Sequence, residues 1–322
     1  MDEFSLIKRY FELPSAESAR VNAQLIQGIG DDCAVLAVPN NQDLVFSLDT
    51  LVEGVHFPVD ASAADIAWRV LGASVSDLAA MGATPNNFTL ALTLPELSES
   101  WLQSFSENLA QAAKQYQLTL AGGDTTKGPL TLSVQVQGFV DKGTALLRSG
   151  AQVGDVICVT GSLGDSRAGL SLLGNAVSSP VHNYLLDRFY RPVPRVSTGQ
   201  LIKPYASSCI DISDGLLADL AHILNRSGKG AKIDSSLLPL SAPLQQIAAD
   251  KALDWALSGG EDFELCFTLS AKNWRLLQAR LAESGHCVAI SNIGVICDEP
   301  GLQLYRNDQW HHVAAKGFKH FL

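Results

Sequence analysis

Five short segments of the chain place aspartates beside glycines or hydroxyl residues, a composition that can bind a divalent cation together with a phosphate. Mg²⁺ prefers oxygen ligands and typically takes one or two protein carboxylates besides phosphate oxygens and water. Helix capping and turn formation are the alternative roles of such residues, and for Ser213 and Asp214 both interpretations stay open. The aspartates of these segments are Asp32, Asp49, Asp77, Asp124, Asp211 and Asp214.

The segment 120–126 combines an apolar approach, two glycines, Asp124 and two threonines. Glycines let backbone N–H groups come close to a polyanion, because they lack a Cβ and can adopt positive φ. We therefore expect a short strand over 118–121 followed by a loop, 122–126, that binds phosphate and a cation. An ordinary turn between strands is the alternative interpretation of the same residues.

Asp77 falls on the same stripe of a predicted helix, 63–81, as Ile66 and Val70. A carboxylate on such a stripe needs a partner, which can be a hydrogen bond in the core or a metal ion. Ser47 and Asp49 share one face of a predicted strand, so both can reach the same ion. Two converging carboxylates about 4 Å apart repel by about 4 kcal/mol at an effective dielectric near 20, and a divalent cation offsets this repulsion.

Strands and helices alternate along the chain, which predicts an α/β fold of two domains. The first domain, 1–145, is expected to hold strands over 44–49, 87–94, 118–121 and 131–140 and helices over 63–81 and 99–117. A glycine-rich stretch follows, and the second domain, 146–322, repeats the alternation. We expect its strands over 155–160, 209–213, 263–269, 288–295 and 302–305, with helices over 165–173, 182–190 and 215–225 and one ending at residue 284.

The formal charge of −10 and the isoelectric point of about 5.1 disfavour a nucleic-acid partner, since no basic stripe is present to contact phosphates. No apolar run approaches the length of a membrane span, and no signal-peptide pattern opens the sequence. We therefore expect a cytoplasmic protein that binds neither nucleic acid nor membrane.

Seven segments in combination resemble the bacterial thiamine-monophosphate kinase family, within the superfamily of aminoimidazole-ribonucleotide synthetase. The resemblance runs from Phe4 to Phe321. The segments that carry it are Gly28–Ala34, Ser47–Phe57, Ser76–Ala83, Gly122–Thr126, Arg148–Ala151, Asp211–Leu216 and Ser258–Glu264.

The resemblance implies ATP-dependent phosphorylation of thiamine monophosphate to thiamine diphosphate, by direct transfer with several Mg²⁺ ions. It also implies the two-domain fold of the superfamily: an N-terminal domain for ATP, Mg²⁺ and dimerisation, and a C-terminal α/β sandwich that completes the active-site cleft. The N-terminal sheets of two subunits would meet in a homodimer.

Site residues follow from the resemblance, position by position. Those implied to bind metal are Asp32, Ser47, Leu48, Asp49, Asp77, Asp124, Asp211 and Asp214; of these, Asp49, Asp77 and Asp124 are also the implied catalytic residues. Leu48 stands where the family commonly has Thr, so only its backbone carbonyl could be a ligand. ATP would contact Gly123, Asp124, Arg148 and Ser213. The thiamine moiety would contact His56, Glu261 and Phe318, the last at a position where the family often has Trp or Tyr.

Two other functions fit parts of the pattern. A sister enzyme of the same superfamily would activate an amide, formyl or selenide substrate with ATP, but the chain lacks the N-terminal cysteine and the terminal cysteine of two such branches. A non-catalytic protein that binds cations or nucleotide would also be acidic in this way. Formation of ADP from ATP and thiamine monophosphate distinguishes the kinase from this second alternative.

Overall fold

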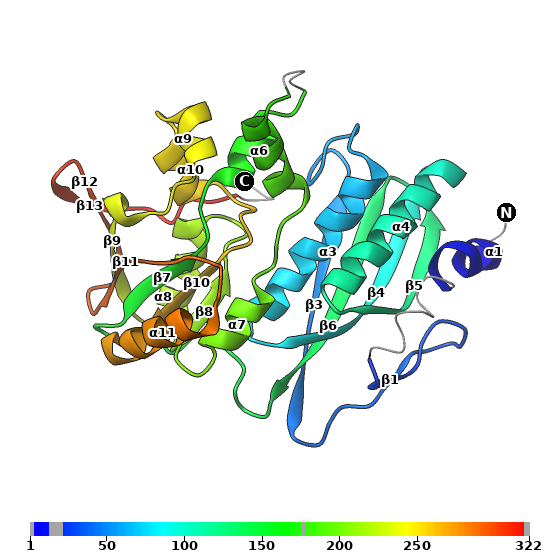
Figure 1. The fold of residues 1–322 in the computed structure, drawn as a ribbon, viewed down its shortest axis with the longest axis horizontal. Coiled ribbons are helices and arrows are strands. Elements are labelled where there is room, and N and C mark those ends of the chain that lie inside the picture. The colour runs from blue at the N-terminus through cyan, green and yellow to red at the C-terminus, as the bar shows by residue number, and fades with distance from the viewer. Residues whose placement is uncertain (1–2, 13–21, 175–177, 319–322) are drawn as a thin grey trace. The chain divides into compact units, whose positions relative to one another are not determined.

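The computed structural model describes residues 3–12, 22–174 and 178–318 of the chain. The chain divides into two compact units, one made of Met1–Leu78 and Ala83–Thr144 and the other of Ala79–Gly82 and Ala145–Leu322. Each unit contains its own sheet, as Figure 1 shows. Among the described residues, no helix combines the length and apolar character needed to cross a membrane.

The first unit is built on a four-stranded sheet in the order β3-β6-β4-β5. Its strands are β3 (Gln42–Val52), β4 (Thr84–Leu94), β5 (Thr119–Lys127) and β6 (Thr131–Asp141). Two helices, α3 (Ala63–Ala80) and α4 (Glu99–Gln115), lie across the same face of this sheet (Figure 1). Their buried side chains, among them Val70, Leu71, Leu102 and Phe105, are fully enclosed and form the core of the unit.

The two faces of β3 differ, as the period-two pattern predicts. Ser47 and Asp49 lie opposite Val136 and Val134 of β6, which are fully buried, so this face is the one that the helices cover. The other face carries three exposed apolar side chains, Leu44, Phe46 and Leu48, with Phe46 and Leu48 each 62% exposed. The sheet is therefore covered on one face and presents apolar side chains on the other.

The predicted loop 122–126 is wrong, because these residues belong to β5. This strand pairs in parallel with β4, with Leu90 opposite Gly123 and Ala91 opposite Asp124, and a register shift lies between Phe88 and Thr89. A Cβ on Gly123 would stand 1.9 Å from the carbonyl oxygen of Leu90. The glycine is thus needed for close approach to the neighbouring strand, and neither Gly122 nor Gly123 has positive φ.

Short elements precede this sheet. The first helix, α1 (Glu3–Ile7), continues into a π-helical turn, η1 (Lys8–Glu12). The strands β1 (Leu25–Gln27) and β2 (Val35–Leu36) pair with each other in a separate two-stranded sheet. Between them, Gly30 has φ of 116°, and Asp31 and Asp32 form an exposed turn.

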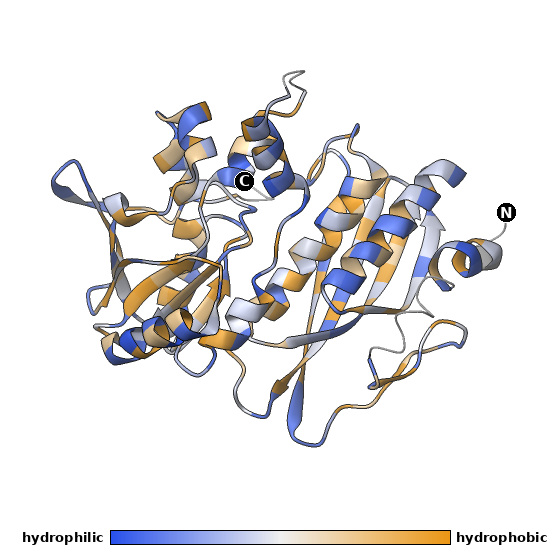
Figure 2. Ribbon diagram, in the orientation of Figure 1, coloured by the Kyte–Doolittle hydropathy of each residue, from blue (hydrophilic) through white to orange (hydrophobic). Residues whose placement is uncertain are grey.

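The second unit has a seven-stranded mixed sheet in the order β13-β12-β9-β11-β7-β10-β8. Within this sheet, the described strands pair antiparallel except for β12 and β9, which pair in parallel. The strands are β7 (Val156–Thr160), β8 (Ser208–Asp211), β9 (Gly230–Asp234), β10 (Leu265–Leu269), β11 (Ile290–Cys297), β12 (Gly301–Arg306) and β13 (Gln309–Val313). Figure 2 shows hydrophobic residues along β7 and β10 and a hydrophilic hairpin at β12 and β13.

Both faces of this sheet are covered, which gives the expected α/β sandwich. One core joins Ile157 and Val159 of β7 to the helices α8 (Leu216–Ser227) and α10 (Ala252–Ser258). A second core joins Cys158 to α7 (Val196–Ile202) and α11 (Ala271–Ser284). A third, smaller cluster packs α5 (Asp165–Ser171), α6 (Pro180–Tyr190) and α9 (Ala242–Ala248) together.

Most predicted elements are present within a few residues of their expected bounds. Gly82 follows α3 with φ of 65°, in the left-handed conformation that commonly ends a helix. The sequence analysis missed β9 and β13. It also missed the turn Asn307-Asp308, whose two positive φ values of 52° and 60° are typical of a tight hairpin.

The close approach of β5 to β4 generates a stability prediction. Gly123→Ala should lower the free energy of unfolding by about 1–3 kcal/mol, because its methyl group would overlap backbone atoms that cannot move without disrupting the sheet. Gly122→Ala is the matched control, since nothing lies within 4 Å of its would-be Cβ. Urea unfolding of both variants checks this; equal stability of the two would contradict it.

Candidate functional site

Three predicted site residues come together on the covered face of the first sheet. Ser47 donates a hydrogen bond from its hydroxyl to the Asp77 carboxylate, which joins β3 to α3. Asp49, two residues further along the same face, interacts with both Asp77 and Ser74 of the helix. The period of two in β3 and the helical spacing in α3 therefore bring the side-chain oxygen atoms of Ser47, Asp49 and Asp77 together.

The electrostatics of this group follow from its burial. The pKa of Asp49 is raised to about 6, chiefly by burial and then by the neighbouring negative charge of Asp77, while a hydrogen bond with Ser74 acts in the opposite direction. Both effects oppose placing two negative charges here. A cation would reverse this balance, so the group made of Ser47, Asp49 and Asp77 fits a hard divalent ion such as Mg²⁺.

The other predicted metal ligands of the first unit lie elsewhere. Asp124 is exposed, and the strand register places it beside Ala91, in the same row as Ser133 two strands away and on the face opposite to Asp49. The side chain of Leu48 also points away from Ser47 and Asp49. Asp32 is exposed in the turn after β1, where its backbone N–H donates to the Asp31 carboxylate at 2.9 Å. Within the described part of the chain, no three His, Cys, Asp or Glu side chains are grouped closely enough to hold a metal ion.

His56 has a defined orientation in the turn after β3. Its ring Nδ1 accepts a hydrogen bond from the backbone N–H of Val52 at 3.0 Å, so in the neutral ring the proton is on Nε2. Arg69, which is 1% exposed, donates from Nε to the His56 carbonyl oxygen at 2.8 Å. The residue therefore presents a hydrogen-bond donor from a fixed backbone.

In the second unit, four predicted site residues meet at the start of α8. Ser213 and Asp214 form the turn between β8 and this helix. Glu261 donates its backbone N–H to the carbonyl oxygen of Ser213 at 2.7 Å, and Phe318 donates its own to the carbonyl oxygen of Asp214 at 3.1 Å. Three segments that are far apart in the sequence are thus joined through one turn.

Asp219 holds this turn in place. One oxygen of its carboxylate accepts the backbone N–H groups of Ser213, Asp214 and Gly215, each at 3.0 Å. The pKa of Asp219 is raised to about 7, chiefly by burial and then by the charge of Asp214, although the three N–H donors act in the opposite direction. The bonds lock the backbone at a position where the family resemblance implies contacts to nucleotide and metal.

Two further predicted residues lie close to β8. Asp211 is its last residue and is 4% exposed. Arg148 is exposed and follows Leu147, whose carbonyl oxygen accepts the N–H of Cys209 at 2.9 Å. The backbone just before Arg148 is therefore bonded to the strand that leads into the turn at Ser213.

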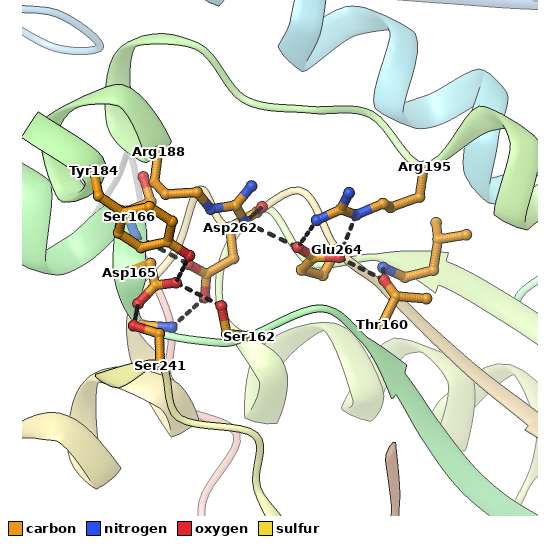
Figure 3. Close-up of polar contacts among 12 residues, drawn as sticks. Thr160, Ser162, Asp165, Ser166, Tyr184, Arg188, Arg195, Ser241, Asp262 and Glu264 are labelled. Atoms are coloured by element: carbon orange, nitrogen blue, oxygen red, sulfur yellow. Dashed lines mark hydrogen bonds and ion pairs between the residues drawn. The ribbon is translucent and has the colours of Figure 1, made fainter. Parts of the chain in front are cut away.

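The sequence analysis missed the residues that support the site. A dense network of buried polar side chains surrounds the segment from Glu261 to Glu264, as Figure 3 shows. Asp219 is recognisable as an acidic residue in the first turn of a helix. The partners of Glu264 come from distant segments, and no local sequence pattern predicts them. They are Thr160, Arg188 and Arg195.

Comparison with known families agrees with the division of the chain. Residues 30–140 match the family model described as AIR synthase related protein, N-terminal domain. Residues 152–307 match AIR synthase related protein, C-terminal domain.

Individual relatives match over almost the whole chain. The thiamine-monophosphate kinase of Escherichia coli (strain K12) is 47% identical, over 99% of this chain and 98% of its own. A crystal structure of thiamine-monophosphate kinase from Stenotrophomonas maltophilia has a TM-score of 0.86 and 42% identity, covering 94% of this chain and 96% of its own. The structure of AaThiL complexed with AMPPCP and TMP has a TM-score of 0.79 and 32% identity, covering 99% and 97%.

The repulsion between Asp49 and Asp77 leads to a prediction for the metal-free protein. Asp77→Asn should raise the free energy of unfolding by about 1 kcal/mol, because one of two repelling charges is removed while an oxygen remains to accept from Ser47. Thermal unfolding in EDTA measures this. Asp60→Asn, at an exposed position, is the control and should change little. A loss of stability in Asp77→Asn would show that the charge is favourable where it stands.

Proposed function

Because the chain belongs to the thiamine-monophosphate kinase family, we propose that it transfers the γ-phosphate of ATP to thiamine monophosphate, forming thiamine diphosphate and ADP. The observation that carries this proposal is the 47% identity with a kinase of that name along nearly the entire length of both chains. The relative complexed with AMPPCP, a methylene analogue of ATP, and with TMP supports both substrates.

The chemistry of the acceptor agrees with the residues present. A phosphomonoester is already largely anionic near neutral pH, so the acceptor needs no general base, unlike the hydroxyl group of an alcohol. Bringing two phosphates together instead requires positive charge. Ser47, Asp49 and Asp77 would hold Mg²⁺, together with Asp32, the Leu48 carbonyl oxygen, Asp124, Asp211 and Asp214. When bound, the metal ions would neutralise phosphate charge on both substrates.

The remaining residues would bind and orient the substrates. Gly123, Asp124, Arg148 and Ser213 are proposed to contact ATP, with residues 1–145 as the domain for ATP, metal and dimer contacts and residues 146–322 completing the site. His56 would donate from Nε2 to the thiamine moiety, Glu261 would offer its carboxylate, and Phe318, 52% exposed, would stack on a ring. The segments Ser76–Ala83, Gly122–Thr126 and Asp211–Leu216, which would bind metal and phosphate, contain no histidine or cysteine, so we propose direct in-line transfer without a phosphoenzyme.

We also propose that two subunits meet through the open face of the first sheet, as the family resemblance implies. The apolar side chains of Leu44, Phe46 and Leu48 support this, because an exposed cluster of this kind on an otherwise acidic protein marks a contact surface. The cytoplasm, which supplies ATP and Mg²⁺, is the proposed compartment.

A turnover assay tests the function. Purified protein with ATP, Mg²⁺ and thiamine monophosphate should release ADP and form thiamine diphosphate. Unphosphorylated thiamine should react negligibly, because it brings no phosphate to the metal-binding group. Asp77→Asn should lose most of the turnover. Absence of ADP would favour a non-catalytic nucleotide-binding protein, and equal reaction of thiamine would mean that the site contains a base that activates a hydroxyl.

The quaternary proposal predicts the effect of charge on the open face. Phe46→Glu should convert a dimer into monomers, because a buried carboxylate in each subunit would face an apolar partner. Sedimentation velocity measures the change. Val59→Glu is the matched control in the same unit, since Val59 is 75% exposed and lies outside β3. A dimer that persists in Phe46→Glu would exclude this face as the interface.

A further inference from the structure

The backbone from Glu261 to Glu264 adopts a conformation that these residues disfavour. Glu261 has φ of 68° and Phe263 has φ of 50°, so two residues with bulky side chains occupy the left-handed region within three positions. Such residues persist there only when the surrounding structure enforces the conformation. The segment leads from α10 into β10 and includes the carboxylate proposed to bind the thiamine moiety.

Glu264 is the strongest anchor of this segment. Its side chain is fully buried, and it is held by the two arginines and one hydroxyl drawn in Figure 3. Arg188 of α6 donates from Nη2 at 2.9 Å, and Arg195, just before α7, donates from Nε at 2.6 Å and also from Nη2. Thr160 at the end of β7 adds a hydrogen bond of 2.6 Å. Two guanidinium groups on one carboxylate offset the cost of burying it.

Asp262 is a second anchor, two positions earlier. Its carboxylate accepts the backbone N–H groups of Gly164 at 2.6 Å and Ser166 at 3.2 Å, at the start of α5. Arg188 links the two anchors, because the same Nη2 that contacts Glu264 also donates to the Asp262 carbonyl oxygen at 3.1 Å. Both anchoring carboxylates are therefore fixed to the interior of the second unit.

The anchored backbone also pairs with the turn that carries Ser213. Phe263 donates its N–H to the carbonyl oxygen of Ile212 at 2.9 Å, and Ile212 donates its own to Glu264 at 2.7 Å. Gly260 fits closely here, since a Cβ would lie 2.5 Å from the carbonyl oxygen of Ser213. Glu261 thus lies between two fixed regions, with its own N–H bonded to Ser213.

We propose that Glu264, held by Arg188 and Arg195, is a positioning residue for Glu261. The buried ion cluster keeps the left-handed backbone at Glu261 and so sets the direction in which its carboxylate meets the cationic thiamine moiety. This inference rests on the proposed function. Glu264 contacts no substrate itself and acts through the backbone of Glu261, so it governs affinity for thiamine monophosphate more than affinity for ATP.

A double-mutant cycle tests the coupling. Glu264→Gln keeps the shape but removes the charge that the arginines need. It should raise the KM for thiamine monophosphate about ten- to hundredfold, with the KM for ATP and kcat within about twofold, because one charged contact is misdirected. In a Glu261→Gln background the same change should add almost nothing to KM. Additive effects of the two substitutions, or an unchanged KM in Glu264→Gln, would overturn the proposal.

A control variant separates positioning from general loss of stability. Asp155 is another buried carboxylate of the same unit, accepting from Gln152 N–H at 2.9 Å and Ser207 Oγ at 2.6 Å. Asp155→Asn should lower the melting temperature without changing the KM for thiamine monophosphate. Should Glu264→Gln not fold, Arg195→Lys serves instead: it keeps the charge but loses the two-pronged contact, and Arg195→Met should raise KM further. Equal KM values for these two arginine variants and the unaltered protein would contradict the proposal.

Amide hydrogen exchange provides a readout that needs no turnover. In Glu264→Gln the amides of Glu261 and Phe263 should exchange faster than in the unaltered protein, while Asp155→Asn leaves them unchanged. Unchanged exchange in Glu264→Gln would show that the carboxylate does not hold the segment. Absence of ADP formation by the unaltered protein would instead overturn the proposed function, and the exchange result would still decide whether Glu264 fixes the backbone.

Discussion

The cost of burying negative charge is the constraint on which both units depend. In the second unit, buried carboxylates are surrounded by donors: Glu264 by two arginines, and Asp219 and Asp262 by backbone N–H groups. In the first unit, Asp49 lies beside another carboxylate, that of Asp77, and hydroxyl groups. The surroundings of a carboxylate therefore distinguish a fixed support from a group suited to bind a cation.

The supporting carboxylates and the proposed metal ligands also lie in different kinds of secondary structure. Ser47 and Asp49 follow the period of two in β3 and so reach one helix face together with Asp77. Because the strand and the helix pack face to face, they hold these three side chains together without the help of a loop. In the second unit, the turn at Ser213 has no such regular frame. Its geometry depends on Asp219, which replaces the regular hydrogen bonds of a strand or helix with three bonds to one carboxylate oxygen.

Sequence patterns predicted the elements that depend on the spacing of neighbouring residues. They failed where the structure depends on contacts between residues far apart in the chain. The stripe of α3, its end at Gly82 and the two faces of β3 follow from periods of 3.6 and 2, and all three are confirmed. The segment 122–126 was predicted to be a phosphate-binding loop because glycines let backbone N–H groups approach a polyanion, whereas Gly123 is required by the close carbonyl oxygen of Leu90 on a neighbouring strand. The partners of Glu264 lie 69 to 104 residues away along the chain, so their convergence exists only in the folded unit.

The left-handed conformation of Glu261 explains why so many contacts hold this segment in place. Glycine would adopt this backbone without cost. Two glycines stand directly before Glu261, yet the left-handed position is occupied by a residue that carries a side chain, so the backbone is strained there. A carboxylate at a left-handed position costs free energy that a glycine would save, and the neighbouring anchors Asp262 and Glu264 must each be buried to enforce it. A strained backbone at Glu261, enforced by two buried carboxylates that arginines and backbone N–H groups compensate, is intelligible when the direction of the Glu261 side chain matters for binding. Asp262 and Glu264 would then serve that direction, and under the proposed function this separates the residue that would contact the substrate from those that position it.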